Sequence, residues 1–193
     1  MTDALTRTRF FFDFRSPYSY LASTQLGDLP GEFDWRPFDV LELMKRVGNV
    51  PTTVICKPKQ AYARQDLGRW AALYGAQLNP NPGMSGVDGP RLLHAALAAR
   101  KLGHGEEAAR RLFRAMWAGD APLAASDDVA ALLADLGVTA GLIDAPERAA
   151  ELEANTAAAV EAGVFGAPSF VTEGGLLFFG NDRLDFLRRA LAA

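Results

Sequence analysis

The sequence contains few residues that bind metals or form disulfides. One cysteine, Cys56, and two histidines, His94 and His104, occur among 193 residues. A single cysteine excludes a disulfide within the chain, and three widely separated residues do not form the Cys/His cluster of a zinc site. We therefore expect no metal centre and a reducing compartment.

Excess positive charge and long apolar runs are absent as well. Lys and Arg total 20 against 23 Asp and Glu, so no basic surface for nucleic acid is indicated. The N-terminal MTDALTRTR has no apolar signal segment, and no apolar run approaches the roughly 20 residues that span a membrane. We expect a cytoplasmic protein that contacts neither nucleic acid nor membrane and that acts on small molecules.

The segment FFFDFRSPYSYLAS, residues 10–23, predicts a strand that turns directly into a helix. The apolar and aromatic run from Arg9 to Phe14 suits a buried strand, and Pro17 cannot donate to a continuing ladder. Ser16 fits the N-cap and Pro17 the first helical position. We call this strand-to-helix turn around Ser16 and Pro17 the elbow. It presents backbone N–H groups and the positive end of a helix dipole, which suits it to holding an anion.

Helical periodicity dominates the middle of the chain. Before it, a short strand is expected over 33–38 and an irregular loop over 41–58. The stretch NPNPGMSGVDGP, residues 79–90, is too rich in Pro and Gly for a regular element, and we interpret it as a lid or pocket wall. The spacing of apolar residues predicts helices over 61–75, 90–103, 105–118, 126–136, 138–144 and 147–162.

A hairpin and a helix are predicted at the end of the chain. Ser169 to Thr172 and Leu176 to Phe179 flank the turn EGG, and Asn181-Asp182 is expected to cap a last helix. The order is therefore β-α-β, a helical block, then β-β-α.

This order predicts an α/β protein with a thioredoxin-like fold and an all-helical insertion between its βαβ and ββα halves. We place the thioredoxin-like domain at residues 1–60 and 164–193 and the insertion at 61–163.

In such a fold the elbow normally carries a redox Cys-x-x-Cys, whose thiolate the helix dipole favours. Here that position reads Ser16-Pro17-Tyr18-Ser19. The protein itself therefore cannot perform disulfide exchange there, but a hydroxyl at the N-cap can donate to a sulfur that another molecule brings. The alternative interpretation of Ser16 is an ordinary N-cap.

Five segments in order resemble those of the 2-hydroxychromene-2-carboxylate isomerases and the similar kappa-class glutathione transferases, which are DsbA-like thioredoxin folds. The segments are FDFRSPYSYLA, VGNVP, KQAYARQDLGRWAALYG, GVFGAPSF and FFGNDRLDFL, and together they cover nearly the whole chain. The resemblance implies glutathione as the cofactor, Ser16 as the catalytic hydroxyl that stabilises its thiolate, and a homodimer. Pro17 and Tyr18 belong to the same thiol-binding elbow.

The resemblance also assigns the two ends of glutathione. The Ala167-Pro168 bond is expected to be cis, and the backbone of Ala167 is then free to pair with the cysteinyl residue of glutathione. The alternative interpretation of Pro168 is an ordinary proline at the start of a strand. Asn181 and Asp182 receive the γ-glutamyl end, although both residue types are also common helix caps.

The resemblance implies two further positions near the thiol or the substrate, and the residue beside Ser16 is a separate candidate. Asn49 matches a family asparagine, and its alternative role is that of a turn residue. Lys59 matches a family lysine that pairs with a carboxylate, but Lys57 stands two residues earlier and is the other candidate. Arg15 either meets a thiolate or substrate carboxylate or faces solvent.

The resemblance implies cis-trans isomerisation of an aromatic enone acid by reversible conjugate addition of a thiolate. Phe38 and Tyr18, with a cation such as Lys59, are expected to receive a flat aromatic carboxylate. Two alternatives stay open. One is a kappa-type glutathione S-transferase, and the other is a non-catalytic thiol-binding domain.

Overall fold

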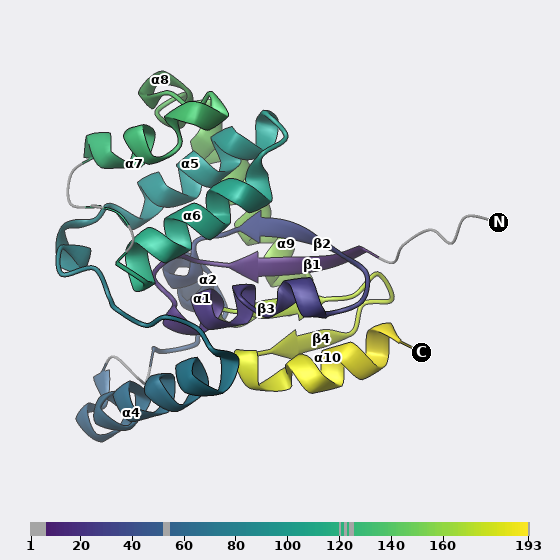
Figure 1. Cartoon of the computed structure of the whole chain (residues 1–193). Coiled ribbons are helices and arrows are strands. Elements are labelled where there is room, and N and C mark those ends of the chain that lie inside the picture. Colours follow the sequence, from purple (N-terminus) through teal and green to yellow (C-terminus); the bar gives the residue numbers. More distant parts are fainter. Residues whose placement is uncertain (1–6, 52–54, 120, 122, 124–125, 193) are drawn as a thin grey trace.

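A mixed four-stranded sheet forms the centre of the computed structural model, which describes residues 7–51, 55–119, 121, 123 and 126–192 (Figure 1). The sheet order is β2-β1-β3-β4, with β1 parallel to β2 and antiparallel to β3, and β3 antiparallel to β4. Its strands are β1 (Arg7–Phe12), β2 (Glu32–Pro37), β3 (Ser169–Val171) and β4 (Leu177–Phe179). The predicted βαβ and ββα halves of a thioredoxin-like fold are confirmed.

Helices cover both faces of the sheet and extend beyond its β2 edge. Figure 1 shows α5 to α8 grouped beside β2, with α4 and α10 end to end on the opposite side. The helices are α1 (Pro17–Ser23), α2 (Val40–Arg46), α4 (Lys57–Tyr74), α5 (Gly89–Lys101), α6 (Gly105–Trp117), α7 (Ser126–Leu132), α8 (Ala140–Ile143), α9 (Glu147–Glu161) and α10 (Leu184–Leu191). Short 3-10 turns lie at Leu26–Asp28, Met84–Gly86, Ala134–Leu136 and Asn181–Arg183.

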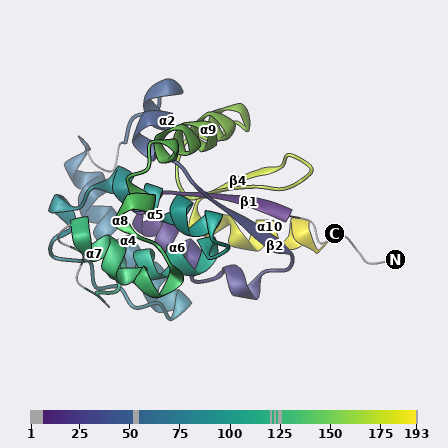
Figure 2. The same cartoon turned by 90° about the horizontal axis from the view of Figure 1, so that it is seen from above.

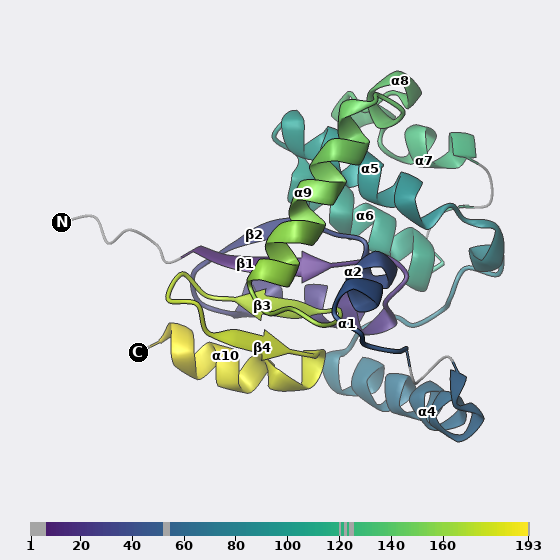
Figure 3. The same ribbon diagram turned by 180° about the vertical axis from the view of Figure 1, so that it is seen from behind.

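Alternation along β1 divides the core into two layers. Phe10 and Phe12 belong to the large cluster that α1, α5, α6 and α10 complete, whereas Phe11 lies in a smaller cluster with residues of α2 and α9. Figure 2 and Figure 3 show α2 and α9 together on that second face. The Phe113 ring of α6 lies 5.3 Å from that of Phe12, so the helical block packs directly on the central strand.

The end of the first strand differs from the prediction. β1 ends at Phe12 and not at Phe14. The carboxylate of Asp13 accepts hydrogen bonds from the backbone N–H of Arg15 and of Val40, and such side-chain contacts compete with the ladder. The turn closes when the Ser16 N–H donates to the Asp13 carbonyl, 3.0 Å away.

The expected loop over 41–58 is wrong for its first part, because α2 occupies Val40–Arg46. Asp39 caps α2 by accepting from the N–H groups of Leu41 and Glu42. The predicted helix over 61–75 begins earlier, at Lys57. Residues 52–54 of the expected loop lie outside the described residues.

The predicted cap of the last helix is also wrong. α10 begins at Leu184, after the turn Asn181–Arg183, and neither Asn181 nor Asp182 is its N-cap. The domain limits at residues 60 and 163 stay a prediction. The structure adds that α9 contacts both α2 and β2, so this helix covers the sheet as well as following the helical block.

The irregular segment 79–90 is tied to the end of α6. The Asn79 N–H donates to the Trp117 carbonyl at 2.7 Å, and the Asn81 N–H donates to the Met116 carbonyl at 2.9 Å. The Trp117 indole in turn donates to the carbonyl of Phe14 at 2.8 Å, and this bond is buried. One tryptophan thus joins the segment, α6 and the turn that precedes Ser16.

We expect Trp117→Phe to lower the free energy of unfolding by about 1–3 kcal/mol, because it leaves the buried Phe14 carbonyl without its donor. Urea denaturation followed by far-ultraviolet circular dichroism measures the loss. Trp70→Phe, at a partly buried position of α4, is the matched control. Equal losses in the two variants would contradict a specific role for the indole bond.

Candidate active site

Ser16 lies at the N-terminus of α1 and links it to the segment before β3. It is the N-cap, with its Oγ accepting from the Ser19 N–H at 3.1 Å, and Pro17 opens the helix. The same hydroxyl donates to the carbonyl of Ala167, 3.2 Å away. Ser16 is therefore the N-cap, as the sequence allows, and it also contacts the Ala167 segment.

The Ala167-Pro168 bond is cis, as predicted. Ala167 lies two residues before Ser169, the first residue of β3 that pairs with β1, so its main chain stands outside that ladder. The carbonyl of Pro168 accepts from the Gly180 N–H at 2.9 Å. This bond brings the start of Asn181–Arg183 to the same end of the sheet as the elbow.

Asn49 is fastened to the strand-entry segment. Its Nδ2 donates to the carbonyl of Phe165 at 2.7 Å, while its Oδ1 accepts from the Val50 N–H at 2.8 Å. Its own N–H donates to the carbonyl of Met44 in α2 at 2.8 Å. Asn49 is thus a turn residue whose side chain also holds the chain two residues before Ala167.

Tyr18 connects α1 with α4. Its hydroxyl donates to the carboxylate of Asp66 at 3.2 Å. Burial, followed by the charge and the hydrogen bond of Asp66 and by the charges of Tyr62 and Asp182, raises the pKa of Tyr18 to about 12. The first turn of α4 contains Lys57 and Lys59, both exposed, and the assignment of either to the site stays a prediction.

Asn181 and Asp182 differ in their surroundings. Asn181 is buried, and its carbonyl accepts from the Tyr74 hydroxyl of α4 at 2.8 Å. The Asp182 carboxylate is 43% exposed and pairs with Arg183. Because the turn Asn181–Arg183 contacts α1, both residues lie near the elbow, where the second part of the site is predicted.

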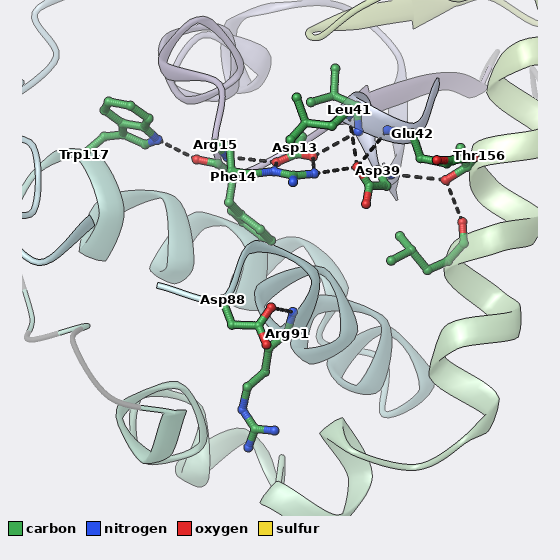
Figure 4. Close-up of polar contacts among 12 residues, drawn as sticks. Asp13, Phe14, Arg15, Asp39, Leu41, Glu42, Asp88, Arg91, Trp117 and Thr156 are labelled. Atoms are coloured by element: carbon green, nitrogen blue, oxygen red, sulfur yellow. Dashed lines mark hydrogen bonds and ion pairs between the residues drawn. The ribbon is translucent and has the colours of Figure 1, made fainter. Parts of the chain in front are cut away.

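The Arg15 side chain neither extends into solvent nor stands unpaired for an anion, because it forms ion pairs with two carboxylates. Figure 4 shows its guanidinium between Asp13 and Asp39, with Nη2 at 2.5 and 2.7 Å from their carboxylates. Burial opposes protonation, but both carboxylates raise the pKa of Arg15. The pKa of Asp39 is lowered from its ordinary value. Burial by itself raises this pKa, but the guanidinium of Arg15 and two N–H groups of α2 lower it by more.

The aromatic surface near the site differs from the prediction. Phe38 is fully buried, with its ring 6.0 Å from that of Phe11, so it cannot receive a substrate. Phe165 and Phe179 are each 41% exposed, and their ring centroids are 4.6 Å apart. Phe165 precedes Ala167 by two residues, a proximity that the GVFGAPSF segment already displays.

Within the described ranges, no three His, Cys, Asp or Glu side chains are placed to hold a metal ion. No described helix combines the length and the apolar character needed to cross a membrane.

The raised pKa of Tyr18 predicts a pH effect on stability. Its folded-state value of about 12 lies above the unfolded value of about 10, so its contribution to the unfolding free energy is constant below pH 10 and falls between those values. The slope is at most about 1.4 kcal/mol per pH unit. The difference between the absorbance titrations of the wild type and of Tyr18→Phe gives the pKa of the Tyr18 phenol. A Tyr18 pKa near 10 would contradict the effect assigned to burial and to the contact with Asp66.

Comparison with known proteins agrees with the fold. Residues 8–192 match the DSBA-like thioredoxin domain. A 2-hydroxychromene-2-carboxylate isomerase of Sphingobium xenophagum is 31% identical over 191 residues, 94% of this chain and 96% of the relative. One of Pseudomonas putida is 28% identical, over 94% of this chain and 92% of the relative.

Solved structures give the same result. A selenomethionine 2-hydroxychromene-2-carboxylate isomerase superposes with a TM-score of 0.83 at 27% identity, over 96% of this chain and 94% of that one. A probable DsbA oxidoreductase of Streptomyces coelicolor, at 18% identity over 96% of this chain and 88% of that one, shares the fold with a TM-score of 0.73. The chain therefore belongs to the DsbA-like thioredoxin family, in the group of the 2-hydroxychromene-2-carboxylate isomerases.

Proposed function

We propose that the protein is a glutathione-dependent cis-trans isomerase of 2-hydroxychromene-2-carboxylate-type aromatic enone acids. The observation that carries this proposal is the Ser16 hydroxyl, which stands at the N-cap of α1 and donates to Ala167 where disulfide oxidoreductases of this fold have a cysteine. The names of the relatives support the isomerase class.

The residues present fit glutathione. The Ala167 main chain stands outside the sheet ladder and is suited to pairing with the cysteinyl residue. The half-exposed Asp182 carboxylate suits the γ-glutamyl ammonium, and backbone N–H groups at Asn181–Asp182 suit its carboxylate. Asn49 and Lys59 complete the proposed binding set. Lys57 is the alternative to Lys59.

When bound, glutathione supplies a sulfur nucleophile whose reversible conjugate addition makes the carbon-carbon double bond single and free to rotate. The protein holds that sulfur as an anion. The Ser16 hydroxyl, which now donates to Ala167, turns its proton toward the sulfur, and the N–H groups of the first turn add their partial positive charge. Each unit by which they lower the thiol pKa corresponds to about 1.4 kcal/mol.

The substrate is a small aromatic carboxylate. We propose that its ring lies against the exposed ring of Phe165, beside Asn49, and that an ammonium of the first turn of α4 meets its carboxylate. We also propose that the protein works in the cytoplasm as a homodimer, as its family resemblance implies.

The test is an assay with a trans-o-hydroxybenzylidenepyruvate and glutathione, with the product mass recorded. A product of unchanged mass whose formation requires glutathione supports the isomerase. A product heavier by one glutathione indicates a kappa-type transferase, which would use the same thiol site. Glutathione binding without turnover indicates a thiol-binding domain and contradicts the enzyme.

We expect Ser16→Ala to reduce turnover about 10- to 150-fold, which corresponds to a hydrogen bond to a charged group of roughly 1.5–3 kcal/mol. Glutathione affinity should stay within several-fold, because other residues hold the ends of the tripeptide. Ser19→Ala is the matched control, since the buried Ser19 hydroxyl has no hydrogen-bond partner among the described residues. Wild-type turnover in Ser16→Ala would remove Ser16 from the mechanism.

A further inference from the structure

We infer that Arg15 is a positioning residue, which together with Asp13 and Asp39 fastens the elbow to α2 and so holds Ser16 opposite Ala167. The role in turnover rests on the proposed function, whereas the mechanical role can be measured without it.

Asp13 is the buried anchor of this arrangement. Its side chain is 0% exposed. One carboxylate oxygen accepts from the N–H and the Nε of Arg15, both at 2.9 Å, and the other accepts from Nη2 of Arg15 and from the Val40 N–H at 3.1 Å. Both oxygens are therefore engaged, and one of the contacts already reaches α2.

Asp39 carries the connection into α2 and α9. Its Oδ1 accepts from Nη2 of Arg15 at 2.7 Å while it caps α2. Its own N–H donates to Oγ1 of Thr156, which in turn donates to the Leu152 carbonyl one helical turn earlier in α9 (Figure 4). A single guanidinium thus bridges two helix-anchoring carboxylates.

The contacts form a closed ring around the candidate site. From Asp39 the ring follows α2 to Met44, whose carbonyl holds Asn49, and Asn49 holds Phe165. Two residues later, the Ala167 carbonyl accepts from Ser16. The Ser16 N–H then closes the ring on Asp13. A displacement at Arg15 is therefore transmitted to Ser16 from both sides.

Charge and packing favour positioning over anion binding. Two carboxylates face one guanidinium, so the triad has a net charge of −1 and does not attract a thiolate or a carboxylate. The arginine is also wedged under the start of α5, because a Cβ at Gly89 would lie 2.8 Å from its Cδ. A lysine, which is a point charge on a flexible stem, cannot reproduce two fixed contacts to different carboxylates.

The experiment compares Arg15→Met and Arg15→Lys with Arg46→Met. Arg46 also pairs with two carboxylates, Glu42 and Glu153, but at the far end of α2 and on the surface. The first readout is amide hydrogen exchange at Val40–Glu42 and at Asn49. We expect exchange at both places to accelerate at least about tenfold in Arg15→Met, less in Arg15→Lys, and not at Asn49 in Arg46→Met.

The second readout separates kcat from KM. We expect Arg15→Met to lower kcat about 10- to 100-fold while the KM for glutathione changes less than about threefold, because misplacement of Ser16 affects the reacting sulfur and not the ends of the tripeptide. Partial recovery of kcat in Arg15→Lys, and turnover within about twofold of wild type in Arg46→Met, complete the expected pattern.

Unchanged exchange at Val40–Glu42 and Asn49 in Arg15→Met would overturn the inference, whatever the wild-type activity. Equal loss of kcat in Arg15→Met and Arg46→Met would also overturn it, since that result indicates general weakening of α2. If Arg15→Met fails to fold, exchange in Arg15→Lys decides. A wild type without turnover contradicts the proposed function alone, because the exchange result stands independently.

Discussion

The elbow depends on one buried carboxylate. Asp13 has no solvent exposure, and a charge in that position is tolerated only when its oxygens are paired and hydrogen-bonded. Arg15 and the Val40 N–H supply those partners, and in doing so they stop β1 at Phe12 and join it to α2. The place at which the chain leaves the sheet is therefore set by electrostatics as much as by the proline that follows.

A serine hydroxyl, and not a cysteine thiol, stands at the N-cap of α1, and this changes the chemistry that the thioredoxin-like elbow can perform. The Ser16 hydroxyl joins the elbow to the cis-proline segment, and the Pro168 carbonyl joins that segment to Gly180, just before the turn Asn181–Arg183. Tyr74 ties the same turn to α4. The fold thus retains a polar site at the end of the sheet, and under the proposed function the reactive sulfur comes from another molecule.

The sequence predicted the strands, most helices and the cis Ala167-Pro168 bond, because local turn chemistry, apolar periodicity and family resemblance all bear on these features. It did not predict α2, although Asp39 is a good N-cap, because Gly48, Asn49 and Pro51 gave the stretch the composition of a loop. The pairing of Arg15 with Asp39 could not be predicted for a different reason. Asp39 lies 24 positions away, and only tertiary packing brings it to the guanidinium.

Ser19 shows what the elbow can no longer do. It stands three residues after Ser16, where a Cys-x-x-Cys motif has its second cysteine, and its hydroxyl is buried without a hydrogen-bond partner in the part of the chain that the structure describes. In disulfide exchange that second cysteine attacks the mixed disulfide on the first cysteine, forms a disulfide with it and releases the bound sulfur as a thiolate. With hydroxyls at both Ser16 and Ser19 the elbow forms no disulfide, so a thiol held there under the proposed function keeps the oxidation state in which it arrived.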